Sequence, residues 1–277
     1  MTAHPLIADY LEWLRQRGQS QRTIDARRDI LGRAHNDLPH GLPAATADEL
    51  ATWLYRDAWS PGTRETYHGA LRSWYVWATQ PDDPRLDWDP SALLPRPDRP
   101  RRLPRPVTDD QLRRILTEAS NPYRRWSLLA AYAGLRCVEI AQLDRNDITP
   151  WAITIRRGKG GRPGIVPTHP AIWAEVADLP SGPLALTDRG EPASAQWVSI
   201  RTALHFRRQL GMPGVALHRL RHWYGTEVYR RTKDIRVTQE LMRHESPATT
   251  AGYTLVSNEE RTAAIRTLPT YTGAQQA

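Results

Sequence analysis

Apolar residues recur at helical spacing through the first part of the chain. Leu6 to Leu14 has an apolar residue every three or four positions, and this pattern ends before Gly18. Thr23 is a candidate cap for a second helix. The capping box Thr46–Glu49 and the Ser60–Pro61 pair predict the starts of a third and a fourth helix. The pattern therefore predicts a small helical domain over residues 1–82.

Residues 83–106 interrupt this periodicity. Prolines are dense here, and because proline cannot continue a helix and favours extended backbone, the segment is predicted to be a linker. Arginines alternate with the prolines and could contact the phosphates of a nucleic acid, although a solvated surface is the alternative. The candidate DNA-binding arginines are Arg96, Arg99, Arg101 and Arg102, together with Arg162 further along the chain.

Residues 107–277 return to a mainly helical pattern with one break. The break alternates apolar and polar residues at 151–155 and 165–167, and the glycine-rich stretch between them predicts a β-hairpin. Helices are expected around it and towards the end of the chain, starting near Thr108, Pro122, Pro170, Ser194, His218, Val237 and Ser257. The predicted fold is mainly α with a small β-hairpin, in two domains.

The net charge of the chain indicates which kinds of molecule it is suited to bind. The 277 residues carry a formal charge of +8, and the isoelectric point near 10.0 favours a polyanion such as nucleic acid or an acidic membrane surface. No run of eighteen apolar residues and no signal-peptide pattern is present, so we expect a cytoplasmic protein with no membrane partner. Cys137 is the only cysteine, which excludes an intramolecular disulfide and a thiolate metal site.

The stretch 217–254 concentrates side chains suited to phosphate chemistry. If His218 lies at the start of a helix, Arg221 and His222 share its face, three and four residues on. Arginine can bond two phosphate oxygens at once, and a neighbouring imidazole exchanges protons near neutral pH. Tyr253 follows, and positive charge beside it would favour its phenolate. These residues indicate a site for an anion that undergoes chemistry.

At these positions the chain resembles the tyrosine recombinases, the phage integrase and Xer-type family. His218-Arg219-Leu220-Arg221 resembles the family's H-x-x-R box, and Tyr253 follows His244 by the family's nine residues. Ala133 to Ile140 is similar to the box that holds the first arginine, Arg136. Lys159, in a glycine-flanked turn, resembles the family's hairpin lysine. The resemblance covers roughly Pro106 to the end.

The resemblance implies covalent phosphoryl transfer on DNA. Tyr253 would attack a backbone phosphate and form a 3′-phosphotyrosyl link. Arg136 and Arg221 would hold the non-bridging oxygens and stabilise the added negative charge of the transition state. Glu139 would orient Arg136 rather than react, although an exposed ion pair between these two residues is the alternative.

The resemblance also implies how protons move. Lys159 would protonate the departing 5′ oxygen, a role that arginine cannot take because it does not give up its proton. His218 would exchange a proton with Tyr253, and His244 would donate a hydrogen bond to the phosphate. No metal is implied, because arginine and lysine supply the positive charge. No nucleotide cofactor is implied either, because one phosphate ester is exchanged for another.

The implied partner is double-stranded DNA at a specific recombination site. The family also implies a homo-oligomer on DNA, a tetramer, with a possible accessory factor that controls direction and a location at the nucleoid. The chain departs from the pattern at Arg243, where most relatives carry glycine before the histidine. Glycine permits backbone angles that other residues adopt with strain, so the backbone next to His244 is in question.

Three other functions remain open from the sequence. A type IB topoisomerase uses a similar set of residues to relax supercoils, and a DNA-binding regulator could keep the fold with an inactive site. A zinc hydrolase using His218, His222 and His244 is disfavoured, because Arg219 stands where a zinc protease needs glutamate and clustered arginines repel a cation. Tyr224 and Tyr229 lie near the site in sequence, but neither follows a histidine by nine residues.

Overall fold

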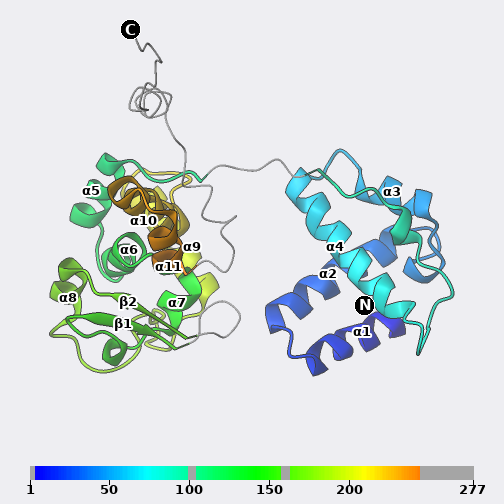
Figure 1. The fold of residues 1–277 in the computed structure, drawn as a ribbon, viewed down its shortest axis with the longest axis horizontal. Coiled ribbons are helices and arrows are strands. Elements are labelled where there is room, and N and C mark those ends of the chain that lie inside the picture. The colour runs from blue at the N-terminus through cyan, green and yellow to red at the C-terminus, as the bar shows by residue number, and fades with distance from the viewer. Residues whose placement is uncertain (1–3, 99–103, 157–162, 244–277) are drawn as a thin grey trace, which may run out of the picture. The chain divides into compact units, whose positions relative to one another are not determined.

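The computed structural model of the chain describes residues 4–98, 104–156 and 163–243. The chain divides into two compact units, Met1–Arg102 and Leu103–Ala277 (Figure 1). Within the described residues the fold is mainly helical with one two-stranded antiparallel sheet, which confirms the predicted fold class. None of the helices in these ranges is both long and apolar enough to cross a membrane.

The N-terminal unit contains the four predicted α-helices. Thr46 and Glu49 form the expected capping box, and the Ser60 hydroxyl caps the fourth helix through Thr63. The helices pack around a buried hydrophobic core that includes Tyr10 and Trp74. Their bounds, with two short 3₁₀ helices, are α1 (Pro5–Gln16), α2 (Gln21–Asp37), η1 (Leu42–Ala44), α3 (Ala47–Leu54), α4 (Pro61–Ala78) and η2 (Pro90–Leu93).

The start of α2 differs from the prediction. The cap is Ser20, whose hydroxyl accepts a hydrogen bond from the amide of Thr23, so the helix begins one turn before the predicted cap. Both residues carry a hydroxyl that can cap a helix. Ser20 caps because its backbone is extended, with ψ at 144°, whereas Thr23 lies inside the helix.

The first part of the predicted linker is folded onto the N-terminal unit. The amide of Leu86 donates to the carbonyl of Ala78, and Leu94 is buried in the same core as the four helices. Asp89, just before η2, pairs with Arg72 of α4 at 2.8 Å. Pro90 begins the 3₁₀ helix η2, which lies against α3 and α4 where an extended linker was predicted, and the division between the units falls after Arg102.

The C-terminal unit is organised around α6 and α10, which pack against each other. Helix α10 also contacts α9 and α11, while α6 contacts α5, α7 and α8 (Figure 1). The elements are α5 (Asp109–Glu118), α6 (Tyr123–Tyr132), α7 (Cys137–Gln142), η3 (Arg145–Asp147), β1 (Ala152–Ile155), β2 (Gly164–Pro167), α8 (Pro170–Val176), α9 (Ala195–Gln209), α10 (Leu217–Thr232) and α11 (Ile235–Met242). Helices α6 and α10 are far apart in sequence. Their packing brings the turn after α6 next to the residues of α10, and the candidate site lies there.

The hairpin predicted from alternation is present. Strands β1 and β2 pair antiparallel with Ile153 opposite Val166, and both side chains are buried in the core of this unit. Thr154 and Ile165 lie on the outer face. Because one face of the hairpin is buried, its register is fixed.

Candidate active site

The site begins at a sharp turn after α6. Gly134 has φ of +60°, and a Cβ atom added there would lie 2.5 Å from Cδ1 of Tyr224 on α10. The position therefore requires glycine for its backbone angle and for its contact with the tyrosine ring. The turn is thereby pressed against α10 and places Arg136, the N-cap of α7, beside it.

Arg136 is oriented by a buried carboxylate. Its backbone amide donates to Oε2 of Glu139 at 2.7 Å, and its Nη1 donates to Oε1 at 2.9 Å. The Glu139 side chain is 0% exposed and that of Arg136 is 24% exposed. An exposed surface pair is therefore excluded. A fully buried carboxylate holds the guanidinium in place from one side, and the partly open side of Arg136 stays available for a ligand.

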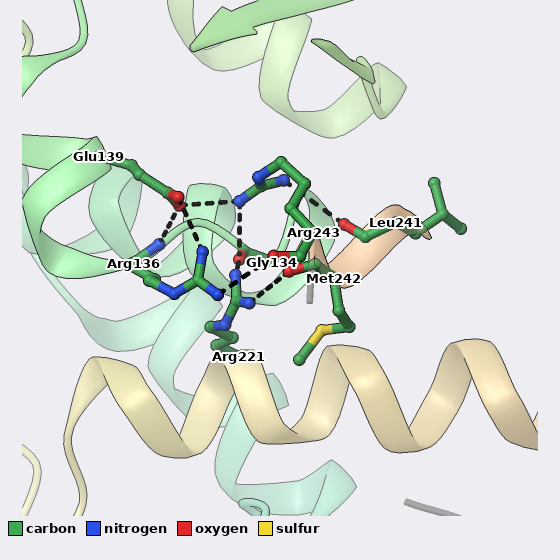
Figure 2. A network of polar contacts seen from close by, with 7 residues as sticks. All are labelled: Gly134, Arg136, Glu139, Arg221, Leu241, Met242 and Arg243. Atoms are coloured by element: carbon green, nitrogen blue, oxygen red, sulfur yellow. Dashed lines mark hydrogen bonds and ion pairs between the residues drawn. The ribbon is translucent and has the colours of Figure 1, made fainter. Parts of the chain in front are cut away.

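Arg221 ties three segments together from α10. Its side chain is buried, its Nη1 donates to the carbonyl of Gly134, and its Nη2 donates to the carbonyl of Met242 at 2.5 Å. Nη2 of Arg136 points to the neighbouring carbonyl of Arg243 at 3.5 Å. The two arginines, which come from different motifs, thus meet at the C-terminal end of α11 (Figure 2).

His218 and His222 share one face of α10, as their spacing predicts. Their ring centroids are 4.2 Å apart. Burial lowers the pKa of His218, and the charges of Arg221 and Arg136 lower it further. The imidazole is therefore neutral at pH 7 and can accept a proton.

His222 gives the protein a testable acid sensitivity. Burial, followed by the charges of His218, Arg221 and Arg219, lowers its pKa to about 4 from an ordinary value of 6.5. Between these two values the unfolded chain takes up a proton that the folded chain does not, so folding stability falls as the pH falls through this window. We expect His222→Gln to reduce the loss of stability between pH 7 and pH 5, measured as the urea midpoint. An unchanged pH dependence in the variant would contradict this assignment.

Arg243 is a site residue that the sequence motifs did not identify. It adopts the left-handed conformation, with φ of 52°, so the backbone angle expected of glycine is present with arginine. Its Nη2 donates to Oε2 of Glu139 at 2.7 Å. Burial alone would raise the pKa of Glu139, but the charge of Arg243, the amide of Arg136 and the charges of Arg136 and Arg221 hold that pKa below its usual value. The signal in the sequence that could have identified Arg243 was that it stands where most relatives carry glycine.

The remaining candidate residues are not part of this network in the described ranges. Lys159, His244 and Tyr253 lie outside the described residues, as do Arg99, Arg101, Arg102 and Arg162. Arg96 belongs to the N-terminal unit, where it is 81% exposed and lies 3.7 Å from Glu65. The arrangement that the structure does describe is a cationic site: three guanidinium groups around one carboxylate, beside a neutral imidazole.

Comparison with known proteins identifies the family to which the chain is similar. The family model described as the phage integrase family matches residues 105–260. Tyrosine recombinase XerC of Rhodospirillum centenum is 33% identical over 293 residues, covering 92% of this chain and 85% of the relative. Tyrosine recombinase XerA of Pyrococcus horikoshii is 28% identical over 275 residues, covering 94% and 92%.

Solved structures show the same fold. A lambda integrase dimer bound to a core site superposes with a TM-score of 0.74 at 20% identity, covering 91% of this chain and 95% of that chain. The XerH site-specific recombinase bound to its difH substrate gives a TM-score of 0.68 at 18% identity, covering 93% and 83%.

The family match and the relatives together show an enzyme that cleaves and rejoins DNA. The chain belongs to the phage integrase family of tyrosine recombinases. It is a site-specific recombinase, and DNA is its partner.

Proposed function

We propose that Tyr253 is the nucleophile and that it joins the DNA through a 3′-phosphotyrosyl bond. The observation that carries this proposal is the convergence of Arg136 and Arg221 at the end of α11. Tyr253 follows the last described residue, Arg243, by ten positions. Ten residues span at most roughly 33 to 36 Å. This length is enough for Tyr253 to reach these arginines in its own protomer.

The geometry of the described residues supports a separate role in the reaction for each site residue. Arg136 and Arg221 bind the two non-bridging oxygens of the phosphate, displacing the backbone carbonyls that they contact in the free protein. The Tyr253 oxygen forms a bond to phosphorus while the bond to the 5′ oxygen breaks. His218, neutral at pH 7, accepts the tyrosine proton. Lys159 protonates the departing 5′ oxygen, and His244 donates a hydrogen bond to the phosphate.

The wider assembly is proposed on the same basis. The helical segment 1–82 serves as a core-binding domain, residues 107–277 as the catalytic domain, and arginines between them, together with Arg162, contact DNA phosphates. We further propose a tetramer on DNA, an accessory factor that sets the direction of recombination, and a cytoplasmic location at the nucleoid. The two solved relatives above are DNA complexes, which supports this mode of binding.

Covalent trapping in the presence of a chelator tests the proposed chemistry. The substrate is a labelled duplex, nicked near the cleavage position, that carries a repeated sequence found beside the gene. Loss of the short fragment beyond the nick then prevents rejoining. We expect a protein–DNA adduct on a denaturing gel, in equal yield with and without EDTA, because arginines supply the charge that a metal supplies elsewhere. A yield that collapses in EDTA and returns with a divalent metal would contradict the mechanism.

A second measurement separates recombination from relaxation. Two duplexes that carry the same site and different labels are incubated with the protein, and exchanged products are resolved by size. We expect exchanged strands in which the label of one duplex is joined to the other. Relaxation of supercoiled plasmid with no exchange at any protein concentration would favour the type IB topoisomerase function instead.

A further inference from the structure

Arg243 occupies a position where a side chain is costly. Its left-handed backbone, with φ of 52°, is a conformation that glycine adopts readily and a long side chain adopts with strain. Its guanidinium is nevertheless directed into the site and not out to solvent: the side chain is 16% exposed and ends 2.7 Å from a Glu139 oxygen. A strained arginine that reaches a fully buried carboxylate calls for a role beyond ending α11.

The contacts around the end of α11 are of two kinds. Arg136 and Arg221 hold the backbone carbonyls of Arg243 and Met242. A DNA phosphate competes for these same guanidinium donors, because a charged acceptor binds arginine more strongly than a carbonyl does. The ion pair from Arg243 to Glu139 uses neither carbonyl, so a phosphate on Arg136 and Arg221 leaves it intact (Figure 2).

We infer that Arg243 is a positioning residue that fastens the start of the segment carrying His244 and Tyr253 to the phosphate site through Glu139. This inference rests on the proposed function of Tyr253. When phosphate draws Arg136 and Arg221 away from the end of α11, the side chain of Arg243 keeps that end against α7. His244 then begins from a fixed point, which raises the fraction of bound complexes in which the nucleophile is in place.

The side chain of Arg243 also depends on Gly164. A Cβ atom added at Gly164, the first residue of β2, would lie 3.1 Å from Cδ of Arg243. This distance is tighter than an ordinary van der Waals contact, and Gly164 has no positive φ that would itself oppose alanine. Gly164→Ala therefore shifts the Arg243 side chain without altering any charged group, which makes it an independent probe of the same contact.

The test measures the single-turnover rate of adduct formation at saturating nicked duplex, together with the DNA concentration for half-maximal rate. We expect Arg243→Gly to lower the rate about tenfold, equivalent to about 1.4 kcal/mol, with the half-maximal concentration changed by less than about twofold. Glycine suits the left-handed backbone, so the variant should fold, and its thermal midpoint is measured beside the wild type. Arg236→Ala on the same helix, which removes an exposed pair with Glu240, is the matched control and should leave the rate unchanged.

The combination of variants decides the mechanism. Gly164→Ala should lower the rate in the wild-type background and have no further effect beside Arg243→Gly, because the side chain it displaces is gone. An Arg243→Gly protein that cleaves at the wild-type rate overturns the inference. So does a Gly164→Ala effect of equal size in both backgrounds. Failure of the wild type itself to form an adduct would instead count against the proposed function, so the two failures are distinguishable.

Discussion

Tyr253→Phe is expected to form no covalent adduct on the nicked duplex. Phenylalanine lacks the oxygen that bonds to phosphorus, and the alternative phenols are poorly suited to replace it. Tyr224 is packed against the Gly134 turn, and burial raises its pKa, which disfavours a phenolate there despite the charges of Arg243 and Arg221. We expect adduct yield to fall below detection on a denaturing gel, a loss of at least about 10³-fold.

DNA affinity of Tyr253→Phe is the companion measurement. The arginine pair and Glu139 are untouched by the substitution, so the dissociation constant from fluorescence anisotropy should stay within about twofold of the wild-type value, at one stated salt concentration. Tyr229→Phe removes a hydroxyl from α10 and serves as the matched control, with normal adduct yield expected. A normal adduct yield from Tyr253→Phe would remove Tyr253 from the mechanism. Failure of the wild type itself to form an adduct is a separate outcome, and it would favour a DNA-binding regulator with an inactive site.

Local signals made the helix starts predictable. Thr46 and Thr108 cap helices through capping boxes, and Ser60 and Ser194 cap through single hydroxyls, all as their sequence neighbours indicate. The wrong prediction at the start of α2 also concerns a cap. Ser20 and Thr23, one turn apart, offer the same cap chemistry, and the residue with the extended backbone that a cap needs is Ser20.

Long-range contacts explain what the sequence did not predict. The 3₁₀ helix η2 lies among prolines that indicate a linker. It is held in place because Asp89 forms an ion pair with Arg72 of α4 and Leu94 is buried in the core of the N-terminal unit. Arg243 is similar: its spacing places it at the end of a helix, but its contact with Glu139 joins residues 104 positions apart. Motif order identified Arg136 and Arg221, whereas their shared use of the α11 carbonyls required the fold.

Arg136→Ala is expected to slow adduct formation by about 10²- to 10³-fold, the effect of removing one donor that stabilises a developing oxyanion, roughly 2.7 to 4 kcal/mol. Of the two motif arginines it is the better one to remove, because its side chain is 24% exposed while Arg221 is buried and holds three segments together. Glu139 would keep its pair with Arg243 at 2.7 Å, so the buried carboxylate is not left without a cation.

Lysine at the same position tests the shape of the donor as well as its charge. Arg136→Lys keeps a positive charge but loses the planar fork, so its rate should fall between those of the wild type and Arg136→Ala. Arg113→Ala removes an arginine from another i,i+3 pair, 71% exposed on α5, and should leave the rate unchanged. Rates come from single-turnover gels, with thermal midpoints beside them to exclude unfolding. If Arg136→Ala folds and cleaves within about threefold of the wild type, the guanidinium serves only to close the turn, and the phosphate must be held by Arg221 and by residues beyond 243.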